Sequence, residues 1–322
     1  MNAHADHAAG LKRTATALLL PALAAGHAAA QQEMAIEVSA GETLTESDLS
    51  SGTFPGANVA PSFTLAPGTV FDINAGGAIG PVGGFDQPFD FRGSTVNINS
   101  GGLFHGTSSV SNITVNIFEG GDAGDRFQAS GSTVNILGGR AGNGAGAFDS
   151  TVNIAGGSVG AGFSAFGGST VNISGGSLGD GFSASGNTTT NISDGRVGNG
   201  YSLSFGSKVN ISGGSIGDHF FAFSGSAVNL FVTQVATDGI DLGLGLGETR
   251  EIDRRGESLL EATLIDGSTF ELILDTDPSQ GLVQSEDFVS SGATLTVTRV
   301  PTPGTAAALG LAGFIAVRRR RG

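Results

Sequence analysis

The chain contains no cysteine and no tryptophan, and it has a single tyrosine among 322 residues. Without cysteine it can form neither disulfides nor thiolate metal sites, and thiol-based catalysis is excluded. Charged residues make up only 14% of the sequence, against roughly 25% in typical globular proteins. The surface must therefore be covered by uncharged polar residues, and the interior must be built from Val, Ile, Leu, Ala and the 21 phenylalanines.

Basic residues are few, and the formal net charge is −14. Six of the 15 basic residues lie in the two end segments, 1–30 and 300–322, whereas Asp6 alone of the 29 acidic residues lies there. The body between these segments is therefore more acidic than the whole chain. Such a surface repels nucleic acid and anionic lipid, so we expect no nucleic-acid partner.

Residues 1–30 have the pattern of a secretory signal peptide. Lys12 and Arg13 precede a short apolar run over 15–25, and three consecutive small residues, 28–30, follow it. A basic region, a short apolar core and small residues at the end are typical of a cleaved export signal. The sequence therefore predicts an exported protein that loses residues 1–30.

The segment 300–322 consists of a proline-rich turn, an apolar stretch over 305–317 and a basic cluster. The residues that define the turn and the basic cluster are Pro301, Thr302, Pro303, Arg318, Arg319, Arg320 and Arg321. This order resembles the PEP-CTERM sorting signal, with threonine in place of the usual central glutamate. The resemblance implies a transmembrane helix, contact with the membrane through this segment, and an exosortase-type sorting enzyme as partner. It also implies a final location at the cell surface, in the outer envelope or in the extracellular matrix.

A repeat of 19 residues occupies the middle of the chain. A tetrad with a central asparagine, most often Val-Asn-Ile, recurs with Asn at positions 97, 116, 135, 153, 172, 191, 210 and 229. One spacing is 18 and the other six are 19. Short alternating segments at this period predict an all-β fold, a single-stranded β-solenoid of about eight to nine 19-residue coils. Because stacked strands lie about 4.8 Å apart, eight coils would make a rod about 40 Å long.

One well-formed coil reads STVNISGGSLGDGFSASGN over 169–187. Its TVNIS segment alternates with a period of two, so we expect Val and Ile to point inward and Thr and Asn to point outward. A Gly-Gly pair makes the next corner, and we expect two short strands in each coil. The predicted inward residues of this copy are Val171, Ile173, Leu178, Phe182 and Ala184.

The repeat defines the domain boundaries. We expect the solenoid over 70–230, beginning with the imperfect tetrad FDIN at 71–74, and an N-terminal cap over 31–69. Beyond it, 231–299 is richer in charge, and its alternating segments predict an antiparallel β cap. Caps are expected because the open end of a solenoid would otherwise pair with other chains.

The repeat carries no arrangement of residues suited to catalysis. His105 and His219 are the histidines outside the signal segment, and they lie in different coils without an acid or nucleophile at a matching spacing. Solenoid polysaccharide lyases and hydrolases have a cleft of carboxylates with Lys or Arg, whereas these coils contain few acids. We therefore expect no catalytic residues, no enzymatic activity and no obligatory cofactor.

Calcium is the one candidate cofactor that the sequence suggests. The segments GGDAGDRF (120–127), GGSLGDGF (175–182) and GGSIGDHF (213–220) resemble the calcium-binding RTX nonapeptide, GGxGxDxUx. The resemblance implies Asp125, Asp180 and Asp218 as metal ligands. The other interpretation is that these aspartates are turn residues, because Asn takes their place in two other coils and one carboxylate per coil offers Ca²⁺ few oxygens.

The outward Thr-x-Asn row is the most regular surface that the sequence predicts. Its members are Thr95, Asn97, Thr114, Asn116, Thr133, Asn135, Thr151, Asn153, Thr170, Asn172, Thr189 and Asn191. Stacked asparagines stabilise a rod by bonding to one another, and a flat array of hydroxyl and amide groups is also what ice-binding solenoids display. We expect a secreted or cell-surface structural or matrix protein that contacts polysaccharide. Ice binding is the first alternative, and a calcium-binding RTX-like solenoid is the second.

Overall fold

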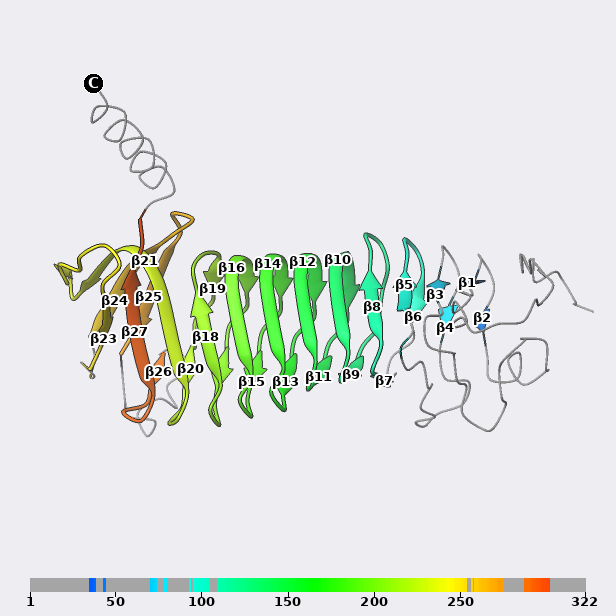
Figure 1. Cartoon of the computed structure of the whole chain (residues 1–322), viewed down its shortest axis with the longest axis horizontal. Helices are drawn as coiled ribbons and strands as arrows, with labels where there is room; N and C mark the ends of the chain where they lie inside the picture. Colours follow the sequence, from blue (N-terminus) through cyan, green and yellow to red (C-terminus); the bar gives the residue numbers. More distant parts are fainter. Residues whose placement is uncertain are drawn as a thin grey trace, which may run out of the picture.

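In the part of the chain that the structure describes, all regular secondary structure is β-strand (Figure 1). The computed structural model describes residues 35–38, 43–44, 70–73, 78–79, 93, 95–104, 109–253, 256, 258–274 and 287–301. The predicted signal peptide, 1–30, and the sorting segment from Thr302 onward lie outside the described residues. Among the described residues, no helix is long and apolar enough to cross a membrane.

The predicted β-solenoid is confirmed. Its first face is a parallel sheet in which each strand pairs with the same segment of the next coil. The strands are β1 (Ala35–Val38), β3 (Val70–Ile73), β5 (Thr95–Ile98), β8 (Thr114–Ile117), β10 (Thr133–Ala141), β12 (Thr151–Val159), β14 (Thr170–Leu178), β16 (Thr189–Val197), β18 (Lys208–Ile211) and β21 (Ala227–Thr237). Asn97 lies opposite Asn116, and this register continues to Asn229. Seven turns of about 19 residues therefore separate these two asparagines.

Each coil has three faces. In the coils that begin with β10, β12, β14 and β16, one nine-residue strand covers the first two faces, so these coils have two strands, as predicted. The second face contains β2 (Thr43–Leu44), β4 (Ala78–Ile79), β6 (Leu103–Phe104), the second halves of β10, β12, β14 and β16, and β19 (Ser215–Ile216). The third face contains β7 (Ser109–Ser111), β9 (Gln128–Ser130), β11 (Gly146–Phe148), β13 (Ser164–Phe166), β15 (Ser183–Ala184), β17 (Ser202–Leu203), β20 (Phe221–Ala222) and β26 (Phe288–Val289). The coils β5/β6/β7 and β18/β19/β20 have three separate strands, which we did not predict, because segments of two or three residues are too short to show a period of two.

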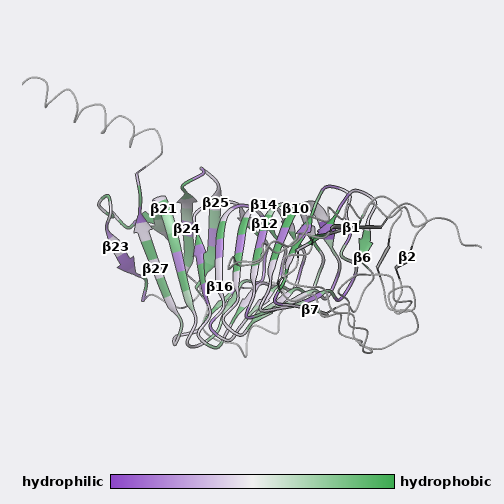
Figure 2. Ribbon diagram, turned by 45° about the vertical axis from the view of Figure 1, so that its right-hand side comes forward, coloured by the Kyte–Doolittle hydropathy of each residue, from purple (hydrophilic) through white to green (hydrophobic). Residues whose placement is uncertain are grey.

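The predicted alternation places the core inside the coils. The strand segment TVNI is half-buried and buried in turn in β5, β8, β10, β12 and β14, and Figure 2 shows the matching bands of hydropathy. The five residues expected to point inward in β14 and the segment that follows it are all buried. Phe163, Phe182, Tyr201 and Phe220 form a column, with neighbouring ring centroids 4.5 to 5.5 Å apart. A single coil could not bury these rings, so the core exists only through stacking.

The corner between the first and second faces of the regular coils requires glycine. Gly176 has φ of +71°, which side-chain-bearing residues rarely adopt. A Cβ on Gly175 would lie 2.5 Å from the carbonyl oxygen of Ala155 in the preceding coil. The Gly-Gly pair therefore lets the backbones of adjacent corners stack directly.

A second column of polar residues closes the coils from the inside. Ser132, Ser150, Ser169, Thr188, Ser207 and Ser226 are buried, and each hydroxyl donates to a carbonyl two or three residues earlier at 2.6 to 2.8 Å. Burial of a hydroxyl is costly unless it is hydrogen-bonded. These bonds therefore hold the turn between the third face and the next first-face strand.

The C-terminal cap is an antiparallel addition to the last coil, as predicted. The long strand β21 pairs antiparallel with β22 (Ile240–Asp241) and β24 (Leu259–Leu264), and β24 pairs with β25 (Thr269–Ile273). The structure adds that β27 (Thr294–Arg299) returns to the solenoid and pairs parallel with the first half of β21 (Figure 1). The other side of β27 is covered by the antiparallel strand β23 (Thr249–Glu251).

Asp287 joins this cap to the solenoid. Its carboxylate accepts the amide of Phe220 at 2.8 Å and the amide of Ile273, in β25, at 3.2 Å. Burial raises the pKa of Asp287, and the two amide hydrogen bonds offset this in part. The nearby carboxylate of Asp218 raises the pKa further. One side chain thus ties the last regular coil to the hairpin that covers it.

One coil carries two hydroxyl groups in the apolar core. Thr190 stands where the preceding coil has Val171, and Tyr201 stands in the phenylalanine column. Neither hydroxyl oxygen has a hydrogen-bond partner within the described structure. Burial raises the pKa of Tyr201 well above its usual value. The nearby hydroxyl of Thr190 lowers this pKa in part, although the two hydroxyls are not placed to form a hydrogen bond.

The raised pKa of Tyr201 predicts a loss of stability at alkaline pH. The unfolded chain releases the phenolic proton near pH 10, whereas the folded chain retains it, so stability falls as pH rises above about 10, by about 1.4 kcal/mol per pH unit. Tyr201 is the sole tyrosine, so tyrosinate absorbance reports on this one group. We expect this absorbance to rise together with unfolding.

Tyr201→Phe supplies the control for this titration. The variant should lose less stability than the parent chain between pH 9 and pH 11, and it should be about 1 kcal/mol more stable at neutral pH because an unpartnered hydroxyl is removed. Tyrosinate absorbance that rises before unfolding, or an unchanged alkaline midpoint in Tyr201→Phe, would contradict the prediction.

Candidate functional site

The first face carries a continuous ladder of side-chain amides. From Asn116 to Asn229, each Nδ2 donates to the Oδ1 of the asparagine one coil earlier, at 2.7 to 2.8 Å. The asparagines are half-buried and lie outside the apolar core, as predicted. Asparagine suits this position because its amide is both donor and acceptor, so identical residues can bond to each other indefinitely.

The two ends of the asparagine ladder carry residues that terminate it. At the N-terminal end, Asn97 donates to the carboxylate of Asp72 at 2.7 Å. At the C-terminal end, the hydroxyl of Thr296 donates to Oδ1 of Asn229 at 2.8 Å. Aspartate needs no donor beyond it, and threonine supplies a donor without requiring another asparagine. The ladder is therefore closed at both ends by groups of the correct polarity.

The threonine row runs beside the ladder in register. The six threonines from Thr95 to Thr189 lie opposite one another in successive strands, followed by Lys208 and Ala227. Each of the six is half-buried, and no hydrogen bond in the described structure engages their hydroxyls. Strand stacking spaces them about 4.8 Å apart along the rod. These hydroxyls, unlike the amides, remain available for an external partner.

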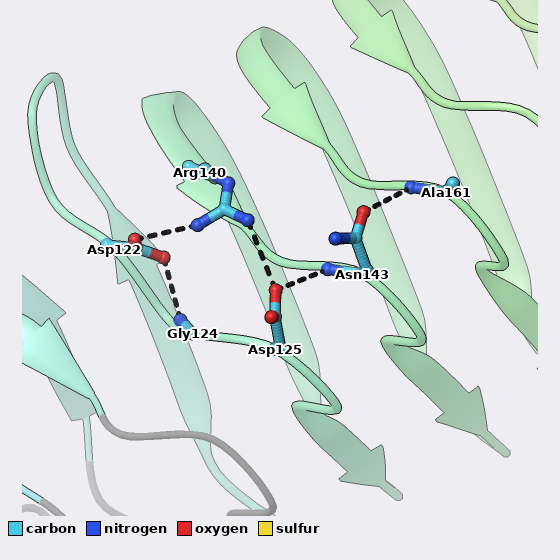
Figure 3. A network of polar contacts seen from close by, with 6 residues as sticks. All are labelled: Asp122, Gly124, Asp125, Arg140, Asn143 and Ala161. Carbon is cyan, nitrogen blue, oxygen red and sulfur yellow. Dashed lines mark hydrogen bonds and ion pairs between the residues drawn. The ribbon is translucent and has the colours of Figure 1, made fainter.

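The calcium candidates lie at the turn before the phenylalanine column, where they link adjacent coils. Figure 3 shows the first case: Oδ1 of Asp125 accepts the backbone amide of Asn143 at 2.8 Å, and Oδ1 of Asn143 accepts that of Ala161 at 3.0 Å. Arg140 bridges the carboxylates of Asp122 and Asp125 at 2.9 and 3.1 Å. This ion pair is solvent-exposed, so it contributes little to stability.

The same link recurs further along the rod. Oδ1 of Asp180 accepts the amide of Asn199 at 2.8 Å, and Oδ1 of Asn199 accepts the amide of Asp218 at 3.0 Å. Asp125 and Asp180 are three coils apart, about 14 Å by the strand spacing. The described residues contain no group of three or more acidic, His or Cys side chains that could hold a metal ion. The structure thus places the three aspartates in separate coils. Asn143 and Asn199 have the equivalent role in two of the coils between them, and Ala161 takes this position in the third.

Of the two histidines singled out in the sequence, the structure describes one. His105 lies outside the described residues. His219 lies at the turn before β20, and its ring lies over Phe221 with 6.4 Å between centroids. Its place in the fold is the end of the solenoid, beside the residues that join the cap.

Sequence reasoning missed a set of exposed phenylalanines. Phe148, Phe166 and Phe223 follow the inward alanine of their coils and are 46, 40 and 43% exposed, and Phe205 is 80% exposed. The signal was in the sequence, because a residue next to an inward one on a strand must point outward. Phenylalanine as a residue type therefore does not predict burial: Phe104 and Phe127 point into the core, as does the column of Phe163, Phe182 and Phe220, whereas these four do not.

The chain matches no protein-family model, no curated protein and no solved structure. Its class is therefore defined by its own geometry: a β-solenoid with an internal aromatic column, an amide ladder and a capped C-terminal end.

The ladder predicts a specific cost for Asn172→Asp. This change replaces the donor that faces Asn153 with a carboxylate oxygen that faces another oxygen. We expect a loss of about 1–3 kcal/mol at neutral pH. The folded state would raise the pKa of the new carboxyl, so the loss should grow as pH rises through about 4. Urea unfolding at pH 3 and pH 7 measures the difference.

Thr170→Val is the matched control for the ladder prediction, because it alters the neighbouring outward residue without touching the ladder. Its effect should stay within about 0.5 kcal/mol. Equal losses in both variants, or an Asn172→Asp loss independent of pH, would contradict the ladder's role in stability.

The coil-linking aspartates predict that Asp180→Asn is tolerated and Asp180→Ala is not. Asparagine keeps the oxygen that accepts the amide of Asn199, whereas alanine removes it and costs about 1 kcal/mol. We also expect the melting temperature to be the same with calcium and with chelator. A calcium-dependent rise that Asp180→Asn abolishes would instead identify the carboxylate as a metal ligand.

Proposed function

We propose that this protein is a non-enzymatic structural component of the cell surface or extracellular matrix. The observation that carries the proposal is the closed asparagine ladder beside an in-register row of threonine hydroxyls. The ladder makes the rod self-supporting without disulfides, and the row offers the same group at every coil. Catalysis needs one unique constellation that breaks the repeat, whereas this face gains its properties from repetition.

The partner that suits this face is an extended, uncharged polysaccharide. Threonine hydroxyls and the remaining amide hydrogens of the ladder match the hydroxyl groups of sugars as donors and acceptors. Each contact is weak, but contacts repeated along one polymer add through effective concentration. The net charge of −14 favours a neutral polymer over an acidic one.

Export and sorting belong to the same proposal. The signal-like segment 1–30 and the PEP-CTERM-like segment 300–322 support secretion, processing by an exosortase-type enzyme and attachment at the cell surface. Fractionation of the native host and the intact mass of the mature protein test this part. A full-length protein found in the cytoplasm would overturn it.

Ice binding is a second candidate, and the threonine row is the observation that favours it. The hydroxyls from Thr95 to Thr189 are regularly spaced and are not used by the fold among the described residues. A flat, regular row of this kind could order water on its surface. Polysaccharide and ice would therefore compete for the same face.

One pair of substitutions tests both functions. Thr133→Leu with Thr170→Leu removes two hydroxyls from the centre of the row and leaves the asparagine ladder unchanged. If the face binds polysaccharide, the double variant should lose mobility retardation in gels containing neutral glucan or mannan. If it binds ice, the parent protein should show thermal hysteresis that the variant lacks.

Ile240→Ser, at a residue 67% exposed in the C-terminal cap and away from the first face, is the control and should leave either activity unchanged. A parent protein with neither retardation nor hysteresis would reject the threonine row as a binding surface.

A further inference from the structure

The strands of the third face carry no charge along the whole rod. From β7 to β26 the sequences are SVS, QAS, GAF, SAF, SA, SL, FA and FV. Their central or second residues point into the core, and Ser, Gln and Phe remain outside, whereas Gly146 is buried. The strands of the first two faces carry charges in some coils, among them Lys208 and Arg196. In a chain with a net charge of −14, a like-charged molecule therefore meets no repulsion from the strands of the third face.

Exposed phenylalanine rings gather on this uncharged face. The outer row, one residue past each inward side chain, reads Ser111, Ser130, Phe148, Phe166, Ser185, Ser204, Phe223 and Ser290. Phe148 and Phe166 lie with ring centroids 5.3 Å apart, and Phe223 lies 5.6 Å from Phe288. Aromatic enrichment with depletion of charge is the composition of a protein interface core.

Phe205 adds a second, independent observation at the edge of this face. It is 80% exposed and has φ of +50°, a conformation that is unfavourable for a bulky residue. Preceding coils have Gly186 and Gly167 after the same outer-row position. A large apolar side chain is thus kept in water and in a strained turn, and such residues cluster at functional surfaces.

The ring geometry distinguishes between occupants. A sugar polymer needs rings that present one flat plane, but Phe148 and Phe166 are inclined by 57°, and Phe223 and Phe288 by 53°. Inclined rings standing between serines instead make knobs and holes. Such a surface suits a partner with equally spaced knobs and holes, which a second copy of the same rod would have.

We propose that two copies of this chain associate side by side through the third face. A two-fold axis parallel to the strands and between β13 and β15 places each phenylalanine of the outer row opposite a serine of the other copy. In this arrangement Phe166 faces Ser185, Phe148 faces Ser204, and Phe223 faces Ser130. The contact is isologous, so it closes as a dimer and does not extend into a filament.

The size of the face sets the strength of this dimer. Eight rungs at about 4.8 Å extend over about 34 Å, and the strands are only two or three residues wide. The area covered is smaller than the roughly 800 Å² per partner of a standard stable interface. The dimer is therefore weak and reversible, with a dissociation constant on the order of micromolar. It does not depend on what the threonine row binds.

Sedimentation velocity of the full chain over a concentration series tests the association. We expect a monomer–dimer equilibrium that Phe166→Ser with Phe223→Ser weakens at least about tenfold. Serine already occupies this row in other coils, so the variant should melt within a few degrees of the parent. The matched control, Phe118→Ser on the first face, should change the dissociation constant less than about twofold.

The absence of cysteine allows the arrangement to be tested directly. Ser111→Cys and Ser290→Cys lie at opposite ends of the face, seven rungs apart within one chain, but they face each other in the proposed dimer. A short bifunctional thiol reagent should crosslink a mixture of the two variants. It should not crosslink either variant alone.

Three results would overturn the proposal. The first is a parent chain that stays monomeric to about 100 µM, far above the expected dissociation constant. The second is crosslinking of Ser111→Cys with itself, which indicates another packing. The third is a monomer whose retardation by neutral glucan or mannan is lost in Phe166→Ser with Phe223→Ser, which would make the third face a sugar-binding surface. The threonine variants of the first face should leave the monomer–dimer equilibrium and the crosslinking unchanged, so failure of the dimer and failure of the threonine row as a binding surface are distinguishable.

Discussion

The whole structure depends on the register that places like residues one strand spacing apart. In a parallel solenoid, each side chain is flanked by its equivalents in the coils before and after it, about 4.8 Å away. A residue type can repeat at a position only if it tolerates its own copy at that distance. Asparagine bonds to itself, phenylalanine stacks on itself, and glycine lets two backbones touch. Repeated like charges would repel, which accounts for a sequence with so little charge.

This constraint explains how much could be predicted from sequence. The Asn spacing and the TVNI alternation were sufficient to predict the solenoid, its first face and the burial of Val171, Ile173 and Phe182. The third face was not predictable, because strands of two or three residues have no measurable period. The return of Thr294–Arg299 to the parallel sheet was also missed. Its long separation from β21 concealed the fact that Thr296 continues the position of Asn229.

The alternation of inward and outward side chains explains why the threonine row was predicted from sequence and the exposed phenylalanines were not. The threonine row lies on the strongest strand pattern, so its register followed directly from the repeat. The exposed phenylalanines lie on the shortest strands, where one residue of error exchanges inside for outside. Phe166 and Phe163 are three residues apart, yet one is on the surface and the other in the core. Composition alone would assign both to the core, and their different positions relative to the inward Ala165 separate them.

The ends of the rod show what limits its growth. A ladder of identical amides has no intrinsic length, so it must be terminated by residues that differ from asparagine. Asp72 accepts without donating further, and Thr296 donates without needing another amide. At the C-terminal end, β23 covers the open edge of β27 with an antiparallel strand, a geometry that a further parallel coil cannot extend. With this end closed to coil addition, the flat sides remain as the surfaces through which such a rod can meet other molecules. The threonine row and the phenylalanine face are therefore where its function must be sought.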